Sequence, residues 1–269
     1  MAEASSPGPW GEWIGRSIEA YDDVVAAPVE RLAALFDHDG AHWPADALPP
    51  LGHWLFTLPD APQSALGPDG HPARGDFLPP IAQPRRMWAG GRLRFLAPIG
   101  IGTRLKRRTA ITAIDTKANG LTFVTLHHAI TADGVTAVEE EQDLVYLPIA
   151  PPGPAKPVAV GAAESTRQLI PDPTMLFRFS ALTFNAHRIH YDRDYARGAE
   201  LYPDLVVHGP LQAMLLVDHA LRDGIVPTRF AFRARAPLHP GTPATLARGG
   251  SDLWVRDATG AVTMTASLA

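Results

Sequence analysis

Four side chains that could do proton chemistry fall within six positions: Asn185, His187, Arg188 and His190. An imidazole has a reference pKa near 6.5 and therefore gains or loses a proton at neutral pH. Further along, His208-Gly209 opens an apolar stretch that is typical of a buried helix, and the N–H groups of a helix N-terminus favour an anionic oxygen. The two segments offer a proton-transfer group and a place for a developing oxyanion. Adding water to a double bond conjugated to a thioester, or removing it, requires both.

Each of these residues has an expected role and a simpler reading. We expect His190 to be the acid–base group and Asn185 to orient a water molecule through its amide. His187 is three positions from His190, so in a helical turn both face one side; it either shares the proton transfer or only contacts a backbone carbonyl. The N–H near Gly209 is expected to bind the thioester oxygen, although Gly209 also permits a tight turn before Pro210.

The residues that surround these groups predict antiparallel strands. Asn119-Gly120 and Asp133-Gly134 are strong hairpin signals because these residues tolerate positive φ. They separate expected strands at 103–115, 121–131 and 135–147. The second half of the chain repeats the pattern with expected strands at 242–248, 251–257 and 261–267.

A short match links the two halves. A strand that ends at Pro98 is followed by Gly102-Thr103, and a strand that ends at Pro237 is followed by Gly241-Thr242. Helices are expected ahead of the strands, at Pro28–Asp37, Leu48–Leu58 and Pro210–Asp223, the last of them apolar nearly all round and therefore buried. A buried helix followed by a curling antiparallel sheet, occurring twice, predicts the α+β class and a double hot dog in one chain.

The proline-rich stretch at 148–157 predicts an extended linker. We therefore expect a first domain at 1–147 that shapes the pocket without catalysing, a linker at 148–169, and a second domain at 170–269 that carries the chemistry. The Pro- and Gly-rich segment 59–88 is long for a loop and is expected to cover the acyl tunnel.

Composition excludes several classes of protein. Cysteine is absent and the formal net charge is −4, so thiolate chemistry and a basic nucleic-acid surface have no support. The chain has no HExxH and no GxGxxG after a strand, and adjacent His127 and His128 should face opposite sides of a strand; we expect no metal and no cofactor. Met1–Pro9 lacks the pattern of a secretory signal and no apolar run is long enough to cross a membrane, which favours a cytoplasmic protein.

The segment 177–217 resembles the hydratase motif of the MaoC-like, hot-dog enoyl-thioester hydratases. The family pattern is roughly Ser-Gly-Asp-x-Asn-Pro-x-His, then His-Gly at the start of the central helix. Here Asn185 occupies the position of the family's usual catalytic Asp, His187 occupies that of the Asn, and His190 occupies that of the catalytic His. The match is closer to the branch of mesaconyl-C4-CoA hydratases and mitochondrial-type 3-hydroxyacyl-thioester dehydratases. The motifs shared with that branch include Phe-Asn-x-His-Arg-Ile-His-Tyr-Asp at 184–192 and Gly-Pro-Asp-Gly-His-Pro at 67–72. The resemblance covers about 10–148 and 170–269.

The resemblance implies a hydro-lyase acting on an acyl-CoA or acyl-carrier-protein thioester, for which mesaconyl-C4-CoA is the leading candidate. A 3-hydroxyacyl-carrier-protein dehydratase is the second enzyme hypothesis. A non-catalytic acyl-thioester-binding subunit is a third, because Asn185 cannot accept a proton as an Asp would. A thioesterase ranks last, since the motif has no carboxylate. Whether the chain forms a homodimer is left open, and Arg85, Arg86, Arg188 and Arg193 are noted as candidate phosphate ligands without a commitment to any.

Overall fold

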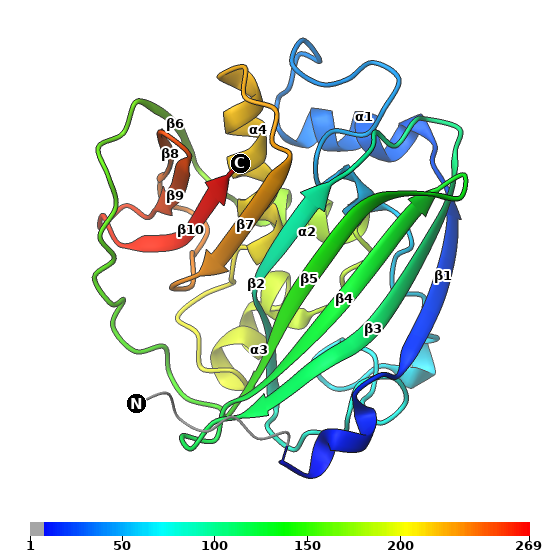
Figure 1. The fold of residues 1–269 in the computed structure, drawn as a ribbon. Helices are drawn as coiled ribbons and strands as arrows, with labels where there is room; N and C mark the ends of the chain where they lie inside the picture. Colours follow the sequence, from blue (N-terminus) through cyan, green and yellow to red (C-terminus); the bar gives the residue numbers. More distant parts are fainter. Residues whose placement is uncertain (1–7) are drawn as a thin grey trace.

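The computed structural model describes residues 8–269, and its strands form one antiparallel sheet (Figure 1). The strand order is β1-β3-β4-β5-β2-β7-β10-β9-β8-β6, which places β2 and β7 side by side at the centre. The strands are β1 (Ser17–Asp23), β2 (Arg85–Phe95), β3 (Arg104–Thr116), β4 (Thr122–Ala132), β5 (Val135–Leu147), β6 (Ser165–Leu169), β7 (Arg229–Ala234), β8 (Ala244–Gly249), β9 (Asp252–Arg256) and β10 (Val262–Leu268).

This order confirms the duplication that the sequence predicts. Reading outward from the β2–β7 pair, each half lists its strands in the same sequence, so that β5 corresponds to β10, β4 to β9, β3 to β8 and β1 to β6. The repeated turn also has one conformation, with φ of +93° at Gly102 and +91° at Gly241. The hairpins fall where they are expected: Asp133 and Gly134 both adopt positive φ, and β3, β4 and β5 match their predicted ranges within a residue.

The helices lie on one side of this sheet. They are α1 (Ala26–Leu35), α2 (Pro173–Leu182), α3 (Arg193–Gly198) and α4 (Gly209–Arg222), with four 3₁₀ turns, η1 (Gly8–Trp13), η2 (Gly52–Leu55), η3 (Gln63–Ala65) and η4 (Arg188–His190). The predicted helices Pro28–Asp37 and Pro210–Asp223 are confirmed within two residues as α1 and α4. Every residue of α4 from Leu211 to Leu221 is buried, as its all-round apolar pattern predicts.

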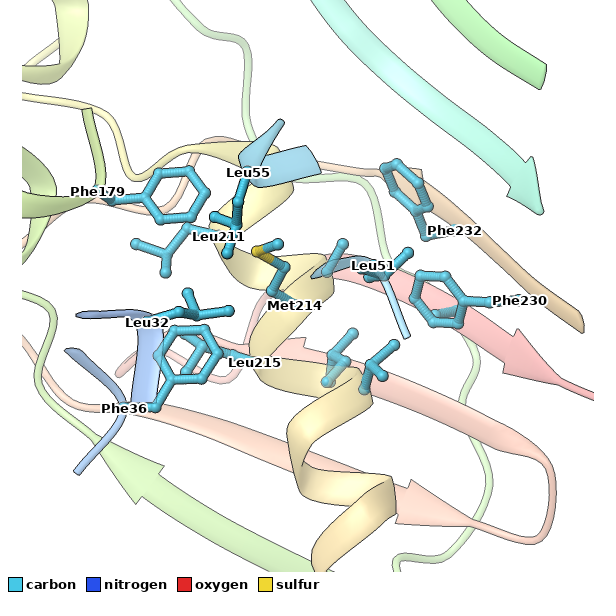
Figure 2. Packing of buried hydrophobic residues seen from close by; sticks show 14 of the residues in the cluster. Leu32, Phe36, Leu51, Leu55, Phe179, Leu211, Met214, Leu215, Phe230 and Phe232 are labelled. Carbon is cyan, nitrogen blue, oxygen red and sulfur yellow. The ribbon is translucent and has the colours of Figure 1, made fainter. Parts of the chain in front are cut away.

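The core is centred on α4 (Figure 2). Leu211 and Leu215 lie on the side of the helix that holds Leu32 and Phe36, and Leu51 and Phe230 lie on the other side. All of them belong to one buried cluster, so the central helix ties α1 to the strands of the second half. The sheet of the second half curls around α4, through contacts with β8, β9 and β10. This is the hot-dog arrangement, and the symmetric strand order makes the whole chain a double hot dog of the α+β class.

The predicted helix Leu48–Leu58 is wrong. Only the four residues of η2 are helical there, because Pro49 and Pro50 cannot join an i→i−4 ladder and Leu51 adopts a left-handed φ of +69°. Within residues 8–269 no long helix packs on the inner face of β3, β4 and β5, and α1 packs mainly on α2 instead. The inner face of the first half is therefore left open to a cavity.

The stretch from 148 to 163 contains no helix or strand and runs along the outside of the second half (Figure 1). Val158 and Val160 pack against the cluster that contains Trp254, so the segment is fastened to the sheet. None of the helices within residues 8–269 has both the length and the hydropathy needed to cross a membrane. Most of Met1–Pro9, where we expect no secretory signal, lies outside the described residues.

Candidate active site

The chemistry-bearing segment follows directly after α2. Asp172 caps that helix by accepting a hydrogen bond from the Met175 N–H at 2.7 Å. Past the helix end, Phe184 takes a φ of +49°, an uncommon conformation for a bulky residue. The Asn185 Oδ1 then accepts a hydrogen bond from the His187 N–H at 2.9 Å, a local turn typical of Asn. This turn starts η4, which brings His187 and His190 to the same side with ring centroids 5.4 Å apart.

His190 is a buried imidazole with one free nitrogen. Its Nδ1 lies 2.7 Å from the Val206 carbonyl oxygen, and because a carbonyl only accepts, Nδ1 carries the proton and Nε2 keeps its lone pair. The ring stacks on His208 at 3.6 Å and 21°. Burial first, and then the neighbouring imidazoles, hold the pKa of His190 well below its usual value. His190 is therefore neutral and able to accept a proton.

The helix tip expected to hold an oxyanion lies next to His190. Gly209 is the first residue of α4, and the first helical bond runs from the Gln212 N–H to the His208 carbonyl, so the Gly209 N–H lies ahead of the ladder. His190 stacks on His208, the residue before Gly209, and both His190 and Gly209 line one cavity. The buried Nε2 of His208 lies 2.8 Å from the Ser180 hydroxyl, and burial lowers the pKa of His208 to about 3.

His187 has a partner that neither reading of the sequence anticipates. Its Nε2 lies 3.1 Å from the Glu200 carboxylate, which also lies 3.4 Å from the Arg85 Nε. A carboxylate accepts, so the His187 Nε2 donates and its orientation is fixed from behind. His187 lines the cavity together with His190 and Asn185. The structure thus brings the predicted residues Asn185, His187, His190 and Gly209 together around one cavity.

A second carboxylate–imidazole pair reaches this space from the first half of the chain. The Nδ1 of His71 lies 3.0 Å from the Asp69 carboxylate, and the His71 ring lies 4.1 Å from that of His187. Burial raises the pKa of Asp69, but the hydrogen bonds from His71 outweigh this effect and keep the carboxyl ionised. Burial lowers the pKa of His71 to about 3, against the opposing effect of Asp69, so the ring is neutral.

The cavity has a volume of about 980 Å³ and is lined by both halves. The segment 59–88 contributes many of the lining residues, which confirms its predicted position over the pocket. The inner face of β3–β5 supplies polar groups, including Glu140, which accepts hydrogen bonds from Trp54 and pairs with His53 at 3.0 Å. His128 faces this interior while His127 lies on the opposite face, as the strand period predicts.

The four candidate arginines separate into two kinds. Arg85 and Arg193 are each held by a carboxylate, Glu200 and Asp204, and Arg188 pairs with Asp192 and donates to the Pro68 carbonyl. Arg86 is different: it is buried, it lines the cavity, and it forms no ion pair with a carboxylate within residues 8–269. Its charge adds to the lowering of the His71 pKa by burial and opposes the rise that burial gives the pKa of Tyr146, so this charge acts inside the cavity.

The sequence predicts no metal, and this stays a prediction. Asp69, His71 and His187 offer three ligand atoms within 4.8 Å of one another. Two of these groups are already hydrogen-bonded to each other, and the far nitrogen of His187 is bound to Glu200. The Asp69–His71 and His187–Glu200 hydrogen bonds therefore occupy part of this set of ligand atoms.

Asp69, His71 and Glu200 are the site residues that the sequence reasoning missed. Asp69 and His71 form an Asp-x-His pattern within the Gly-Pro-Asp-Gly-His-Pro segment at 67–72. A carboxylate two positions before a histidine was the available signal, but nothing local says where such a loop lands. Glu200 has no local signal at all.

Comparisons with known proteins identify the family. Residues 51–240 match the family Hydroxyacyl-thioester dehydratase type 2. The chain is 47% identical over 256 residues to a mesaconyl-C(4)-CoA hydratase of Chloroflexus aurantiacus, covering 92% of this chain and 91% of that one. It is 26% identical over 279 residues to the mitochondrial hydroxyacyl-thioester dehydratase type 2 of Schizosaccharomyces pombe, covering 87% and 91%.

Among solved structures, a MaoC-like dehydratase from Phytophthora capsici superposes with a TM-score of 0.70 at 13% identity, covering 95% of this chain and 96% of that one. At this identity the likeness concerns the fold, and it agrees with the double hot dog described above. The family match and the relative at 47% identity carry the assignment further. The chain belongs to the hydroxyacyl-thioester dehydratase type 2 family and is a hydro-lyase.

Proposed function

We propose that this chain adds water to mesaconyl-C4-CoA to give citramalyl-CoA, and that it also runs the reverse dehydration. The observation that carries the proposal is the 47% identity to the Chloroflexus hydratase over 92% of the chain. The site supports it, because a neutral imidazole and the first N–H of a buried helix face one cavity. These are the groups that conjugate addition of water requires.

In the proposed reaction the His190 Nε2 accepts a proton from water as the water oxygen forms a bond to Cβ. The π electrons of the C=C bond move toward the thioester, and the Gly209 N–H donates to the thioester oxygen as negative charge builds there. Cα then takes the proton back from the His190 imidazolium, which restores the neutral ring and the thioester carbonyl. The Asn185 Oδ1 is engaged by the His187 N–H, so Asn185 acts through its NH₂ group as a donor to the water or the new hydroxyl.

Arg86 gives this substrate a further point of attachment. The mesaconyl group has a free carboxylate on Cβ, whereas a straight-chain enoyl group has none. Arg86 is a buried cation in the cavity without a carboxylate partner among the described residues. An Arg–carboxylate pair is short and directional, so Arg86 is proposed to select the dicarboxylic acyl group.

The test is a panel of thioesters followed by the loss of enoyl-thioester absorbance. Mesaconyl-C4-CoA should have the highest kcat/KM, with crotonyl-CoA and longer straight-chain enoyl-CoA substrates behind it. Arg86→Gln should lower kcat/KM for mesaconyl-C4-CoA by about tenfold or more while changing crotonyl-CoA little, since one charge-assisted hydrogen bond contributes about 1.5–3 kcal/mol. Equal loss on both substrates, or no preference in the wild type, would refute this assignment.

A second candidate is the dehydration of 3-hydroxyacyl thioesters on a carrier protein. The Schizosaccharomyces relative and the family match favour the dehydration of a hydroxyacyl thioester, and the carrier protein is this proposal's addition. Longer 3-hydroxyacyl thioesters on acyl-carrier protein, measured beside the same groups on CoA, separate the two candidates. Carrier-protein substrates outperforming mesaconyl-C4-CoA would establish the second.

Two further points extend this proposal. The absence of cysteine suits a reducing compartment, and we propose that the chain acts in the cytoplasm. Strands β1 and β6 are the two edges of the sheet, where a second copy would add to form a homodimer. Light scattering of the purified protein gives the mass that decides between one copy and two.

A further inference from the structure

A short loop of the first half enters the site of the second half. It consists of residues 67–72 and closes on itself, with the Gly67 N–H donating to the His71 carbonyl at 2.7 Å. Two hydrogen bonds from Arg188 hold this loop against residues 185–188. The Arg188 N–H donates to the Asp69 carbonyl at 2.9 Å, and the Arg188 guanidinium donates to the Pro68 carbonyl at 3.0 Å.

Gly70 shows how close this approach is. Its φ is +88°, and a Cβ built there would lie 1.8 Å from the Ala186 carbonyl oxygen. Only a residue without a side chain fits, so the loop is seated directly on the backbone beside Asn185 and His187. The result is that His71 becomes part of the cavity wall, with 23% of its side chain exposed to that space.

His71 has the same chemical state as His190. Both Asp69 oxygens are used on residue 71: Oδ1 accepts from the backbone N–H and Oδ2 from Nδ1, each at 3.0 Å. Nδ1 therefore carries the proton, and Nε2 keeps a lone pair. The partners differ, because His190 is backed by a neutral carbonyl and His71 by an ionised carboxylate. An imidazolium formed at His71 is stabilised by a charge-assisted hydrogen bond.

The attacking water has two O–H bonds and needs two acceptors to be oriented. The His190 Nε2 supplies one. The Asn185 oxygen accepts from the His187 N–H, and the His187 Nε2 donates to Glu200, so the ring lone pairs that remain beside it are those of the His187 Nδ1 and the His71 Nε2. The Glu200 carboxylate behind His187 is shared with Arg85, whereas both oxygens of Asp69 serve residue 71. The His71 side chain is also 23% exposed, against 6% for His187, so His71 is the better second acceptor.

We propose that His71, oriented by Asp69, is a second acid–base residue that works with His190 on the same water molecule. The inference rests on the proposed hydration of an enoyl thioester. In that step the water oxygen bonds to Cβ, and the proton it loses passes to the Nε2 of one imidazole while the other holds the remaining O–H. The C=C pair becomes the enolate, and Cα takes its proton from the imidazolium, which restores both rings. Asp69 is a positioning residue, because it acts only through His71.

The experiment compares four variants with the wild-type chain on mesaconyl-C4-CoA. His71→Asn keeps a donor for Asp69 but has no titratable nitrogen; it should lower kcat by about 10²-fold or more with KM little changed. Asp69→Asn should lower kcat in the wild-type background and have no further effect on the His71→Asn background. His71→Asn combined with His190→Asn should be far less damaging than the product of the two single effects, since residues that act as a unit are not additive. His239→Asn is the matched control, as His239 makes a similar Nδ1 contact, to Leu205 O at 2.8 Å, outside the cavity.

The possible outcomes distinguish a failure of the His71 proposal from a failure of the proposed function. If His71→Asn turns over at the wild-type rate while His190→Asn does not, His71 is not an acid–base residue and the proposed function stands. If Asp69→Asn still slows the His71→Asn enzyme, Asp69 has a structural role and the pairing is wrong. If a chelator abolishes activity and Zn²⁺ restores it, the cluster is a metal site and the proposal is refuted. If the wild type hydrates none of the thioesters, the proposed function fails and this inference fails with it.

Discussion

The two halves of the sheet have the same strand order but different interiors. In the second half α4 fills the space inside the curl, and every residue from Leu211 to Leu221 is buried. In the first half the equivalent face looks into a cavity of about 980 Å³ and presents His128, Glu140 and Gln142 to it. One copy of the fold supplies a packed core and the helix tip, and the other supplies room for a substrate. The candidate active site lies where they meet, since the cavity is lined by His190 from one half and by His71 from the other.

The packing of the two interiors can be compared by deleting the same side-chain volume from each and measuring the loss of stability. Leu216 is fully buried in α4, so Leu216→Ala leaves a closed void and should cost near the upper end of the 2–5 kcal/mol typical of such changes. Leu126 already lines the cavity, so Leu126→Ala only widens it and should cost near the lower end. Denaturant unfolding of the two variants measures the difference. Equal costs would mean that the cavity is packed in solution.

The second test breaks the contact between the halves without removing a reactive group. Gly70→Ala forces a Cβ into the Ala186 carbonyl and should displace His71, lowering kcat by roughly 10²-fold, as misplacements of about an ångström do. Gly260→Ala is the matched control, because its φ of +87° carries the same backbone strain in open space. Gly70→Ala should lose more stability than Gly260→Ala, because the clash adds to the shared backbone strain, and only Gly70→Ala should lose activity. Parallel losses of activity would argue against the loop's role.

The third test concerns the helix tip. A Cβ at Gly209 would meet only the Trp88 carbonyl, at 3.8 Å, so Gly209→Ala is tolerated by the protein. Alanine favours a helix over glycine by about 0.5–1 kcal/mol, and stability should hold or rise. The methyl group would instead crowd the thioester oxygen, so kcat/KM should fall by about tenfold. A stable variant of unchanged activity would remove Gly209 from the site.

The smallest expected effect is the dependence of stability on pH. Burial gives His71 and His208 pKa values of about 3 and holds that of His190 well below its usual value, whereas unfolded histidines titrate near 6.5. Below pH 6.5 the unfolded chain binds more protons than the folded chain. The stabilisation from the neutral rings is therefore complete above that pH and falls as the pH drops from 6.5 toward about 3. His208→Gln should reduce this slope in urea unfolding, and an unchanged slope would contradict the assignment of a neutral, buried His208.

Much of the architecture was predictable because its signals are local. The Asp133-Gly134 turn, the repeated Gly102 and Gly241 turns and the apolar α4 depend on residues next to one another in sequence. The predicted Leu48–Leu58 helix failed on equally local grounds, since an apolar pattern was given more weight than Pro49 and Pro50. Strands β1 and β6 at the edges have weak patterns and were not predicted.

The site was predictable only in part. His187, His190 and Asn185 share one turn, so their spacing places them together, and the resemblance points to Gly209. Asp69 lies more than a hundred positions before His187 in the sequence. Its position near His187 in the fold depends on how β2 pairs with β7 and on the space that Gly70 leaves. Long-range placement of this kind is a property of the packed fold rather than of any local pattern.

In the proposed mechanism the His190 imidazole transfers a proton to or from a substrate held at the tip of α4. The most direct measurement is the rate of hydration of mesaconyl-C4-CoA by His190→Asn beside the wild type, with incorporation of solvent deuterium at Cα as a second readout. The kcat of His190→Asn should fall by about 10²-fold or more, with one deuterium at Cα in each product molecule of the wild type and a matching drop in labelled product for the variant. Hydration by His190→Asn at the wild-type rate would contradict this mechanism.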